Sequence, residues 1–298
     1  MNKKNKHQED YDFKALIEVY TELEPFVFIN KYDKQTIDFA DAKAVKALNT
    51  ALLKAYYYID FWQFPDTNLC PPIPGRVDYI HLIADLLNAS KIKSDITVLD
   101  IGTGASCIYP LLGYAEYKWQ FVATDSNKKS IAYAEKIIIK NKLKKAIQLK
   151  HQSNTQSIFI GIINTNDAFS VSMCNPPFFK NEAEAFEATT RKLKGLGKLT
   201  DSVTRNFAGQ AHELCFKGGE KAFLHTYLYE SSLFKTQCFW YTSLVSNKDN
   251  IKSMKQSLTK LGATTIKIIE MNQGNKKSRV VAWTFLTTKQ QQDWINKK

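Results

Sequence analysis

The sequence predicts an α/β fold: a small helical N-terminal element, then a mostly parallel, doubly wound sheet. Strand-like and helix-like segments alternate through the middle of the chain, as in "ITVLDIG", "SCIYPLLGYA" and "WQFVATD". Such alternation is typical of βαβ units in a parallel sheet. The chain then ends in "ATTIKIIEMNQGNKKSRVVAWTF", two strand-like runs joined by a polar link that contains glycine. This ending predicts an antiparallel hairpin at one edge of the sheet.

Residues 1–70 are expected to form the N-terminal helical element. The segment "DAKAVKALNTALLKAYY" has helical spacing, and the surrounding text is rich in aromatic residues. The first ten or so residues are polar, so we expect them to be mobile. Residues 71–298 form the predicted main domain. It opens with the proline-rich "LCPPIPGRVDYIHLIADLL", in which Tyr79, Leu82, Ile83 and Leu86 lie at helical spacing.

The elements of the main domain follow in order. The strand "WQFVATD" leads into the helix "NKKSIAYAEKIIIKNKL", for which Ser126 or Asn127 is the expected cap. Further strands are "AIQLKHQ", "FSVSMC" and "QCFWYTSLV". A parallel sheet closed by a C-terminal antiparallel strand is the pattern of class I S-adenosylmethionine (SAM) methyltransferases. Residues 180 to about 217 interrupt this order with a charged stretch of little apolar periodicity, which predicts a functional or disordered insert.

Composition narrows the function classes. The chain has 298 residues, 44% of them apolar, and a formal net charge of +12. The charge favours a polyanionic partner, nucleic acid first, over a merely basic surface. Five scattered cysteines without a CxxC pair indicate neither a disulfide framework nor a zinc site, and suit a reducing cytoplasm. We expect no metal, no signal peptide and no membrane helix.

The segment "VLDIGTGAS" predicts a ligand site at a strand end. The strand ends in Asp100, and Gly102 and Gly104 then turn the chain into a helix. In doubly wound folds, ligands lie beyond the carboxyl ends of the strands, and glycines let the backbone approach them. An ordinary strand–helix turn remains an alternative. So does a dinucleotide site, although Cys107 occupies the third glycine position of the GxGxxG fingerprint.

Asp125 lies at the tip of the next predicted strand. A carboxylate there accepts hydrogen bonds from both ribose hydroxyls of a nucleoside. Taken alone, Asp125 would fit a helix cap equally well. Together, Gly102, Gly104 and Asp125 predict adenosine binding, but they do not separate NAD from SAM.

The segment "VSMCNPPFF" favours SAM over NAD as the bound nucleoside. Two prolines end the strand and hold a rigid loop. In that loop the side-chain oxygen of Asn175 and the carbonyl of Pro176 form an acceptor pair, which would hold the two N–H bonds of an exocyclic amine. Pro177 keeps the loop rigid, and Phe178 offers a face on which a base can stack. The pattern therefore predicts methylation of an amine, with a simple strand-ending Asn-Pro turn as the alternative.

Other charged residues carry weaker predictions. Arg76, in the proline-rich loop, would pair with a carboxylate such as the methionyl end of SAM, or would be an ordinary surface arginine. The lysines of "EKIIIKNKLKK" are most simply a solvated helix face, with RNA contact as the less favoured interpretation.

From "YDFKAL" to "VVAWTF" the sequence resembles the bacterial 23S rRNA adenine-1618 N6-methyltransferases, the RlmF type. The segments that carry the resemblance are "LCPPIPGRVDYIH", "VLDIGTGASCIYPLLG", "MCNPPFF", "FAGQAHELCFKGGE", "WYTSLVS" and "GNKKSRVVAWTF". A more distant similarity is to eukaryotic U6 snRNA adenine-N6 methyltransferases, which share the Asn-Pro-Pro-Phe tetrad and the arginine of the proline-rich loop.

This resemblance implies SAM as methyl donor and an adenine N6 of 23S rRNA, or of a large-subunit assembly intermediate, as acceptor. It implies a target-adenine loop of Asn175, Pro176, Pro177 and Phe178. It implies SAM contacts by Arg76, Asp100, Gly102, Gly104 and Asp125. RNA contacts are expected in the insert and in "GNKKSR", at Arg191, Lys192, Lys194, Lys276, Lys277 and Arg279. Two departures, Phe179 for an expected His and Ser106 for an expected Asn, leave the acceptor pair intact.

Three rival functions stay open at this point. A protein glutamine N5-methyltransferase also uses an Asn-Pro-Pro-aromatic loop, but favours Tyr after the prolines and has less use for the +12 charge. A DNA adenine methyltransferase would need a target-recognition domain, which the sequence does not suggest. An inactive RNA-binding assembly module would keep the fold without the chemistry. We expect a monomer.

Overall fold

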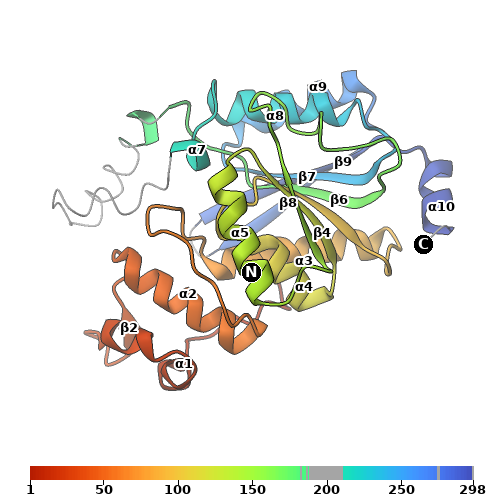
Figure 1. Cartoon of the computed structure of the whole chain (residues 1–298). Helices are drawn as coiled ribbons and strands as arrows, with labels where there is room; N and C mark the ends of the chain where they lie inside the picture. Colours follow the sequence, from red (N-terminus) through yellow and green to blue (C-terminus); the bar gives the residue numbers. More distant parts are fainter. Residues whose placement is uncertain (182, 186, 188–210, 274–275, 297–298) are drawn as a thin grey trace.

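The structure is a computed structural model of the chain and describes residues 1–181, 183–185, 187, 211–273 and 276–296 (Figure 1). Its centre is a seven-stranded sheet in the order β5-β4-β3-β6-β7-β9-β8. The strands are β3 (Thr97–Ile101), β4 (Gln120–Asp125), β5 (Ile147–His151), β6 (Phe169–Cys174), β7 (Cys238–Val245), β8 (Thr265–Gln273) and β9 (Lys276–Thr284).

The pairing of the strands confirms the predicted α/β fold. Strands β5, β4, β3, β6 and β7 are mutually parallel, and β9 pairs antiparallel with both β7 and β8. The C-terminal hairpin predicted from the sequence is therefore β8–β9, inserted so that β9 lies inside the sheet and β8 at its edge. Strands β6 and β7 are buried along their whole length, which is typical of parallel strands covered on both faces.

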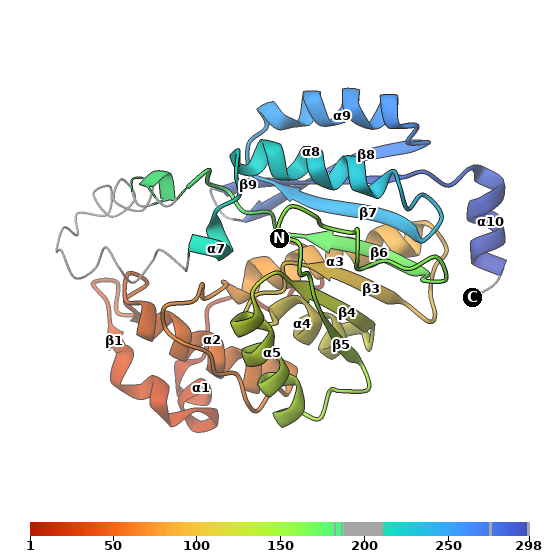
Figure 2. The same ribbon diagram turned by 45° about the horizontal axis from the view of Figure 1, so that its top comes forward.

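Helices cover the two faces of the sheet as separate layers (Figure 2). On one face lie α3 (Ile73–Ala89), α4 (Ile108–Tyr117) and α5 (Lys128–Lys140). On the other lie α8 (Gly219–Ser231) and α9 (Asp249–Leu261), which share a hydrophobic core with Leu99, Phe169 and Trp283 of the sheet. A final helix, α10 (Thr288–Asn296), follows the hairpin. No helix in the part of the chain that the structure describes is both long and apolar enough to cross a membrane.

The N-terminal element is less purely helical than its sequence predicts. Helix α1 (Phe13–Val19) leads through a 3-10 turn (Thr21–Phe26) into a hairpin of β1 (Val27–Ile29) and β2 (Gln35–Ile37), and α2 (Ala42–Tyr57) follows. The hairpin was missed because its strands have only three residues each and lie in an aromatic-rich stretch. The element also shares one hydrophobic core with the sheet, since Leu52 and Trp62 belong to the same cluster as Val98 and Phe121.

The first residues, which their polar composition predicts to be mobile, make hydrogen bonds to the main domain in the structure. The backbone N–H of Asn2 and the side-chain amide of Asn5 both donate to Asp78 of α3, at 2.7 and 3.0 Å. Asn5 and His7 are buried. Burial, together with the charge of neighbouring Lys6, lowers the pKa of His7 to about 4. Side-chain hydrogen bonds to distant residues hold this segment, and composition does not reveal such bonds.

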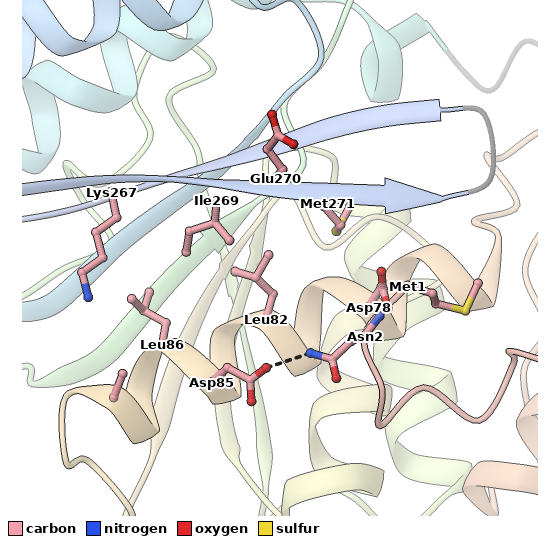
Figure 3. A pocket seen from close by; sticks show the side chains of 11 residues that line it. Met1, Asn2, Asp78, Leu82, Asp85, Leu86, Lys267, Ile269, Glu270 and Met271 are labelled. Carbon is pink, nitrogen blue, oxygen red and sulfur yellow. Dashed lines mark hydrogen bonds between the residues drawn. The ribbon is translucent and has the colours of Figure 1, made fainter.

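A cavity of about 450 Å³ lies beside this N-terminal segment, between α3 and β8 (Figure 3). Met1 and Asn2 line one side of it, and Asn2 donates a 2.8 Å hydrogen bond to Asp85 of α3. Lys267 and Glu270 of β8 line the other side. None of the residues predicted to bind a cofactor or to act in catalysis lies here, so this cavity is separate from the candidate active site.

Candidate active site

A second cavity, of about 280 Å³, lies beyond the carboxyl ends of β3, β4 and β6. This is where doubly wound folds bind their ligands. Six of the nine residues predicted for catalysis or cofactor binding line it: Arg76, Gly102, Gly104, Asp125, Asn175 and Pro177. Asp100 and Pro176 are buried behind its wall, and Phe178 is half-buried without lining it. The structure thus brings together residues that are up to 101 positions apart in the chain, Arg76 and Pro177.

The turn after β3 forms one wall of this cavity. Gly102 and Gly104 have φ of +75° and +66°, a region that disfavours residues with a Cβ. The backbone N–H groups of Gly102 and Thr103 both donate to the carbonyl of Thr124 in β4, at 2.9 Å. A Cβ added to Gly102 would meet no protein atom within 4 Å. The glycine is therefore required by its backbone angle, and the space in front of the turn is open to a ligand.

Asp125 connects this turn to the end of β4. Its Oδ2 accepts the N–H of Gly104 at 2.9 Å, and its Oδ1 accepts the N–H of Asn127 at 2.8 Å. The cap of α5 is Asn127, whose side-chain oxygen accepts hydrogen bonds from the N–H groups of Lys129 and Ser130. Asn127 was one of the two caps predicted from the sequence. Asp125 is therefore not the helix cap. Each carboxylate oxygen has a further lone pair, so Asp125 can still accept hydrogen bonds from a bound ribose.

Asp100 lies behind the glycine turn and is fully buried. Neither of its carboxylate oxygens makes a hydrogen bond within the described part of the chain, and neither do the nearby hydroxyls of Thr103 and Tyr109. Burial raises the pKa of Asp100 to about 7; the proximity of Thr103 opposes this shift, and the charge of Asp125 adds to it. Buried polar groups are normally paired. An unpaired buried carboxylate beside an open cavity therefore suits a ligand that carries a positive charge.

Arg76 supplies a positive charge to the same cavity from the first turn of α3. Its guanidinium carbon lies 5.7 Å from the centre of the Tyr109 ring, a cation–π arrangement that helps to position it. It forms no ion pair with any residue that the structure describes. Arg76 is thus available for a ligand carboxylate.

The opposite wall is the loop that follows β6. Asn175 is half-buried and lines the cavity, and its side-chain amide makes no hydrogen bond to a described residue. Pro176 behind it is buried. Phe178 packs edge-to-face on Phe179, with ring centres 6.4 Å apart. The loop therefore presents an unused amide to the cavity on a backbone that two prolines and a buried strand hold rigid.

A buried hydroxyl network anchors β6 three residues before this loop. The Ser172 hydroxyl pairs with that of Tyr227 of α8 at 2.8 Å, and Tyr227 also donates to the carbonyl of Thr242. The Thr242 hydroxyl donates to the carbonyl of Ser172 and pairs with Tyr79 of α3, both at 2.8 Å. Helices from both faces of the sheet are thereby attached to the strand that carries Asn175.

The loop also joins the two ends of the insert. The N–H of Phe179 donates to the carbonyl of Leu214, and the N–H of Phe216 donates to the carbonyl of Phe179, both at 3.0 Å. Both chain ends of the insert are thus held beside the candidate active site. Its middle part, including Arg191, Lys192 and Lys194, lies outside the described residues.

Sequence reasoning missed a third wall, which consists of Gln152, Thr155, Ser157 and Ile158 after β5. One oxygen of the buried Glu230 holds it by accepting the N–H groups of residues 158, 159 and 160, at 2.9, 2.6 and 2.9 Å. The position of this segment at the carboxyl end of a predicted strand was the available signal.

Glu213 was missed as well. It lines the cavity from α7 (Ala211–Leu214) and accepts hydrogen bonds from the side chain of Asn68 and the N–H of Leu69, at 3.0 and 2.9 Å. It thereby attaches the end of the insert to the proline-rich loop that precedes Arg76. The available signal was its place in "FAGQAHELCFKGGE", one of the segments that carry the family resemblance.

Of the hairpin residues predicted to contact RNA, Arg279 is described and is not among the residues that line this cavity. Arg279 of β9 is half-buried and lies opposite Glu270 in the β8–β9 register. Lys276 and Lys277 belong to β9, but their side chains lie outside the description. Among the residues that the structure describes, no group of three or more His, Cys, Asp or Glu could hold a metal ion.

Comparisons with known proteins agree with this arrangement. Residues 1–287 match the model of a family described as RNA methyltransferase. The chain is similar to the Ribosomal RNA large subunit methyltransferase F of Pseudomonas aeruginosa, with 46% identity over 99% of this chain and 90% of the relative. It is also similar to the protein of that name from Flavobacterium psychrophilum, with 46% identity over 99% and 96% of the two chains.

Two solved structures extend the similarity to the fold. The hMettl16 catalytic domain in complex with MAT2A 3′UTR hairpin 1 has a TM-score of 0.82 at 28% identity, covering 97% of this chain and 96% of that one. The N-terminal domain of human METTL16 in complex with SAH has a TM-score of 0.77 at 26% identity, covering 96% and 99%.

Proposed function

The chain belongs to the RNA methyltransferase family, and from this premise we propose that it transfers a methyl group from SAM to N6 of one adenine in 23S rRNA, the position-1618 type. The names of its bacterial relatives support large-subunit rRNA as substrate. The SAH complex of a related structure supports SAM as donor. The Asn-Pro-Pro-Phe loop supports the choice of an exocyclic amine as acceptor.

One observation carries the proposal: the unused amide of Asn175 lies in the same cavity as the glycine turn and Arg76. In this arrangement the Asn175 side-chain oxygen and the Pro176 carbonyl accept the two N–H bonds of the adenine amine. Holding both N–H bonds draws the nitrogen lone pair out of conjugation with the ring and aims it across the cavity. Because the prolines fix the loop beforehand, little reorganisation is needed when the amine arrives.

The residues on the other side fit the donor. When bound, SAM supplies an electrophilic methyl group on a sulfonium. The guanidinium of Arg76 would pair with its carboxylate, and the negative charge of Asp100, buried behind the cavity wall, would favour its ammonium. Asp125 would accept the ribose hydroxyls, while Gly102 and Gly104 leave room for the methionyl chain. No side chain is required as a general base, because the amine nitrogen attacks while still protonated and loses its proton to water afterwards.

The proposal is tested by mapping methylated adenines in rRNA from cells with and without this protein by mass spectrometry. We expect one adenine of 23S rRNA to lose its N6-methyl group in the deleted strain and to regain it on complementation. Complementation with Asn175→Ala should not restore it. An unchanged adenine pattern, with a methyl group missing instead from a protein glutamine, would replace the RNA substrate by a protein substrate.

Purified protein and SAM labelled in the methyl group then distinguish the form of the substrate. Protein-free 23S rRNA, large-subunit particles stripped with salt and mature subunits are offered in parallel. We expect transfer to the protein-free RNA or to the stripped particles, because an unpaired adenine is needed to reach the cavity. Changing Arg191, Lys192 and Lys194 together to Ala tests the RNA contacts predicted for the insert, and should lower RNA affinity without changing SAM affinity.

A further inference from the structure

The solvent face of α5 and the turn after it carry a large share of the positive charge. Residues 128–145 contain seven lysines and a single acidic residue, Glu135, a local charge of +6 within a total of +12. By contrast, residues 1–60 contain nine lysines and ten acidic residues. All seven lysines are exposed, and none forms an ion pair with a residue that the structure describes. We call this set the lysine face: Lys128, Lys129, Lys136, Lys140, Lys142, Lys144 and Lys145.

The lysine face begins beside the candidate active site. Asp125 and Ser126 line the cavity, and α5 starts two residues later with Lys128 and Lys129. Lysines at a helix N-terminus oppose the helix dipole, and the first turn of α5 has no acidic residue to balance them. The position of Lys128 and Lys129 therefore does not stabilise α5. At 1.5 Å per residue, the 13-residue helix carries the lysine face about 20 Å away from the cavity.

The segment that follows α2 lies against the far end of this face. Its residue Phe61 exchanges two hydrogen bonds with Asn141 at the end of α5, at 3.1 and 2.7 Å. The ammonium of Lys136 lies 5.5 Å from the centre of the Phe61 ring. Tyr58 is three residues from Phe61, so their Cα atoms are at most about 11 Å apart. Tyr58 therefore belongs to the short segment that joins α2 to this contact with the end of α5.

The conformation of Tyr58 is unfavourable for a tyrosine. It ends α2 in the left-handed region, at φ 57° and ψ 37°, where glycine or asparagine is the usual residue. Its side chain is 86% exposed, so burial of the ring does not offset the backbone strain. An exposed ring in a segment that is held against the end of a lysine-rich helix matches the composition of surfaces that bind single-stranded nucleic acid, where aromatic rings stack on bases and cations contact phosphates.

We propose that the lysine face and Tyr58 together bind an unpaired strand of the substrate RNA that leads away from the active-site cavity. The lysines would contact successive phosphates, and Tyr58 would stack on one base. This inference rests on the proposed function, because it takes RNA as the substrate. RNA is a better occupant than an anionic membrane surface, because the lysine face begins beside the cavity that is proposed to receive an adenine of the RNA.

The first test removes charge from the lysine face. The variant changes Lys136, Lys140 and Lys144 to Ala, and the matched control changes Lys252, Lys255 and Lys260 of α9, on the other face of the sheet, to Ala. Binding of a fluorescein-labelled oligoadenylate of about 16 nucleotides is followed by anisotropy between about 50 and 200 mM salt, with SAH present. We expect at least a tenfold loss of affinity at the lowest salt. The salt slope should flatten by about 0.7 for each phosphate that the variant no longer binds, and the control should behave as the wild type.

The second test uses Tyr58→Asn, for which the proposal and a structural role predict opposite results. Asparagine tolerates the left-handed region, so the variant should melt at the same or a higher temperature than the wild type. Its affinity for the oligoadenylate should nevertheless fall about tenfold, whereas Tyr58→Phe should keep most of it. A lower melting temperature with unchanged affinity would overturn the role of Tyr58.

The outcome is separable from that of the proposed function. Methyl transfer by the wild type to rRNA is measured on its own, so its absence would count against the proposed function. If the wild type methylates rRNA while the triple-lysine variant binds the oligoadenylate normally, only the inference about the lysine face fails. It fails equally if that variant keeps RNA affinity and loses binding to phosphatidylserine vesicles.

Discussion

The two walls of the active-site cavity use their polar groups in opposite ways. We call the wall proposed to bind the methyl donor SAM the donor side. There the N–H groups of Gly102, Thr103 and Gly104 all donate hydrogen bonds to β4, and both carboxylate oxygens of Asp125 accept backbone N–H groups. We call the wall proposed to bind the methyl-accepting adenine the acceptor side. There the side-chain amide of Asn175 makes no hydrogen bond to a described residue. The donor wall is thus built by its own functional groups, whereas the acceptor wall is built by prolines and a buried strand.

This difference predicts how substitutions on the two sides will behave. A change on the donor side should disturb the wall and the binding of SAM together, because the same atoms serve both. A change at Asn175 should leave the wall intact, because the loop does not depend on that side chain. The comparison fails if binding and turnover respond in the same proportion on both sides.

Asn175→Ala should have the largest effect. We expect turnover to fall by about 10²–10³, the usual loss when one preorganised polar group is removed from a reacting centre. SAM affinity by calorimetry and the melting temperature should stay close to the wild-type values. The matched variant Asn175→Asp keeps an acceptor oxygen and should retain more turnover than Asn175→Ala. If Asn175→Ala also loses SAM affinity, the two walls are not independent.

Asp125→Ala should have the next largest effect, this time on SAM binding. Losing hydrogen bonds from the ribose to a charged group costs about 1.5–3 kcal/mol, which lowers affinity about 10- to 150-fold. The melting temperature should fall as well, since Gly104 and Asn127 lose their acceptor. Asn127→Ala is the control: it removes the cap of α5, at about 1 kcal/mol of stability, and should leave SAM affinity nearly unchanged. Equal affinity losses in the two variants would make Asp125 a structural residue only.

The strands that carry the site residues could be predicted from local patterns in the sequence. Strands β3, β4 and β6 follow from apolar runs that end in Asp100, Asp125 and Asn175, and the sheet topology then brings those ends to one edge. The hairpin β1–β2 escaped prediction, because three-residue strands have too little alternation to detect. The turn of this hairpin places Asp33 at φ 56°, a left-handed conformation that glycine usually adopts. Because the turn contains no glycine, the sequence did not signal it.

The rest of the site depends on hydrogen bonds between distant parts of the chain. Glu230 shapes the cavity wall at residues 158–160, about 70 positions away, and Glu213 holds Leu69, 144 positions away. In each case a carboxylate replaces water as the acceptor for backbone N–H groups. A single sequence contains no periodicity or spacing that connects such partners.

The smallest expected effect is a pH dependence that originates from Asp100. Burial raises the pKa of this carboxyl to about 7, well above its ordinary value near 4. Between these two values the folded protein without ligand holds a proton that the unfolded chain has released. Its stability should therefore fall as pH rises from about 4 to about 7, and level off above that.

Ligand binding should move this titration. The ammonium of SAM or SAH beside Asp100 favours the charged carboxylate and lowers its pKa. Binding below pH 7 should then release a proton, so SAH affinity should rise by a few-fold from pH 6 to 7 and stay constant from 7 to 8. Calorimetry at pH 6.5 in two buffers of different ionisation enthalpy measures the released proton directly. Asp100→Asn should abolish both the proton release and the slope. If the variant keeps the wild-type slope, another group carries the titration, and the unpaired carboxylate of Asp100 does not meet the ammonium.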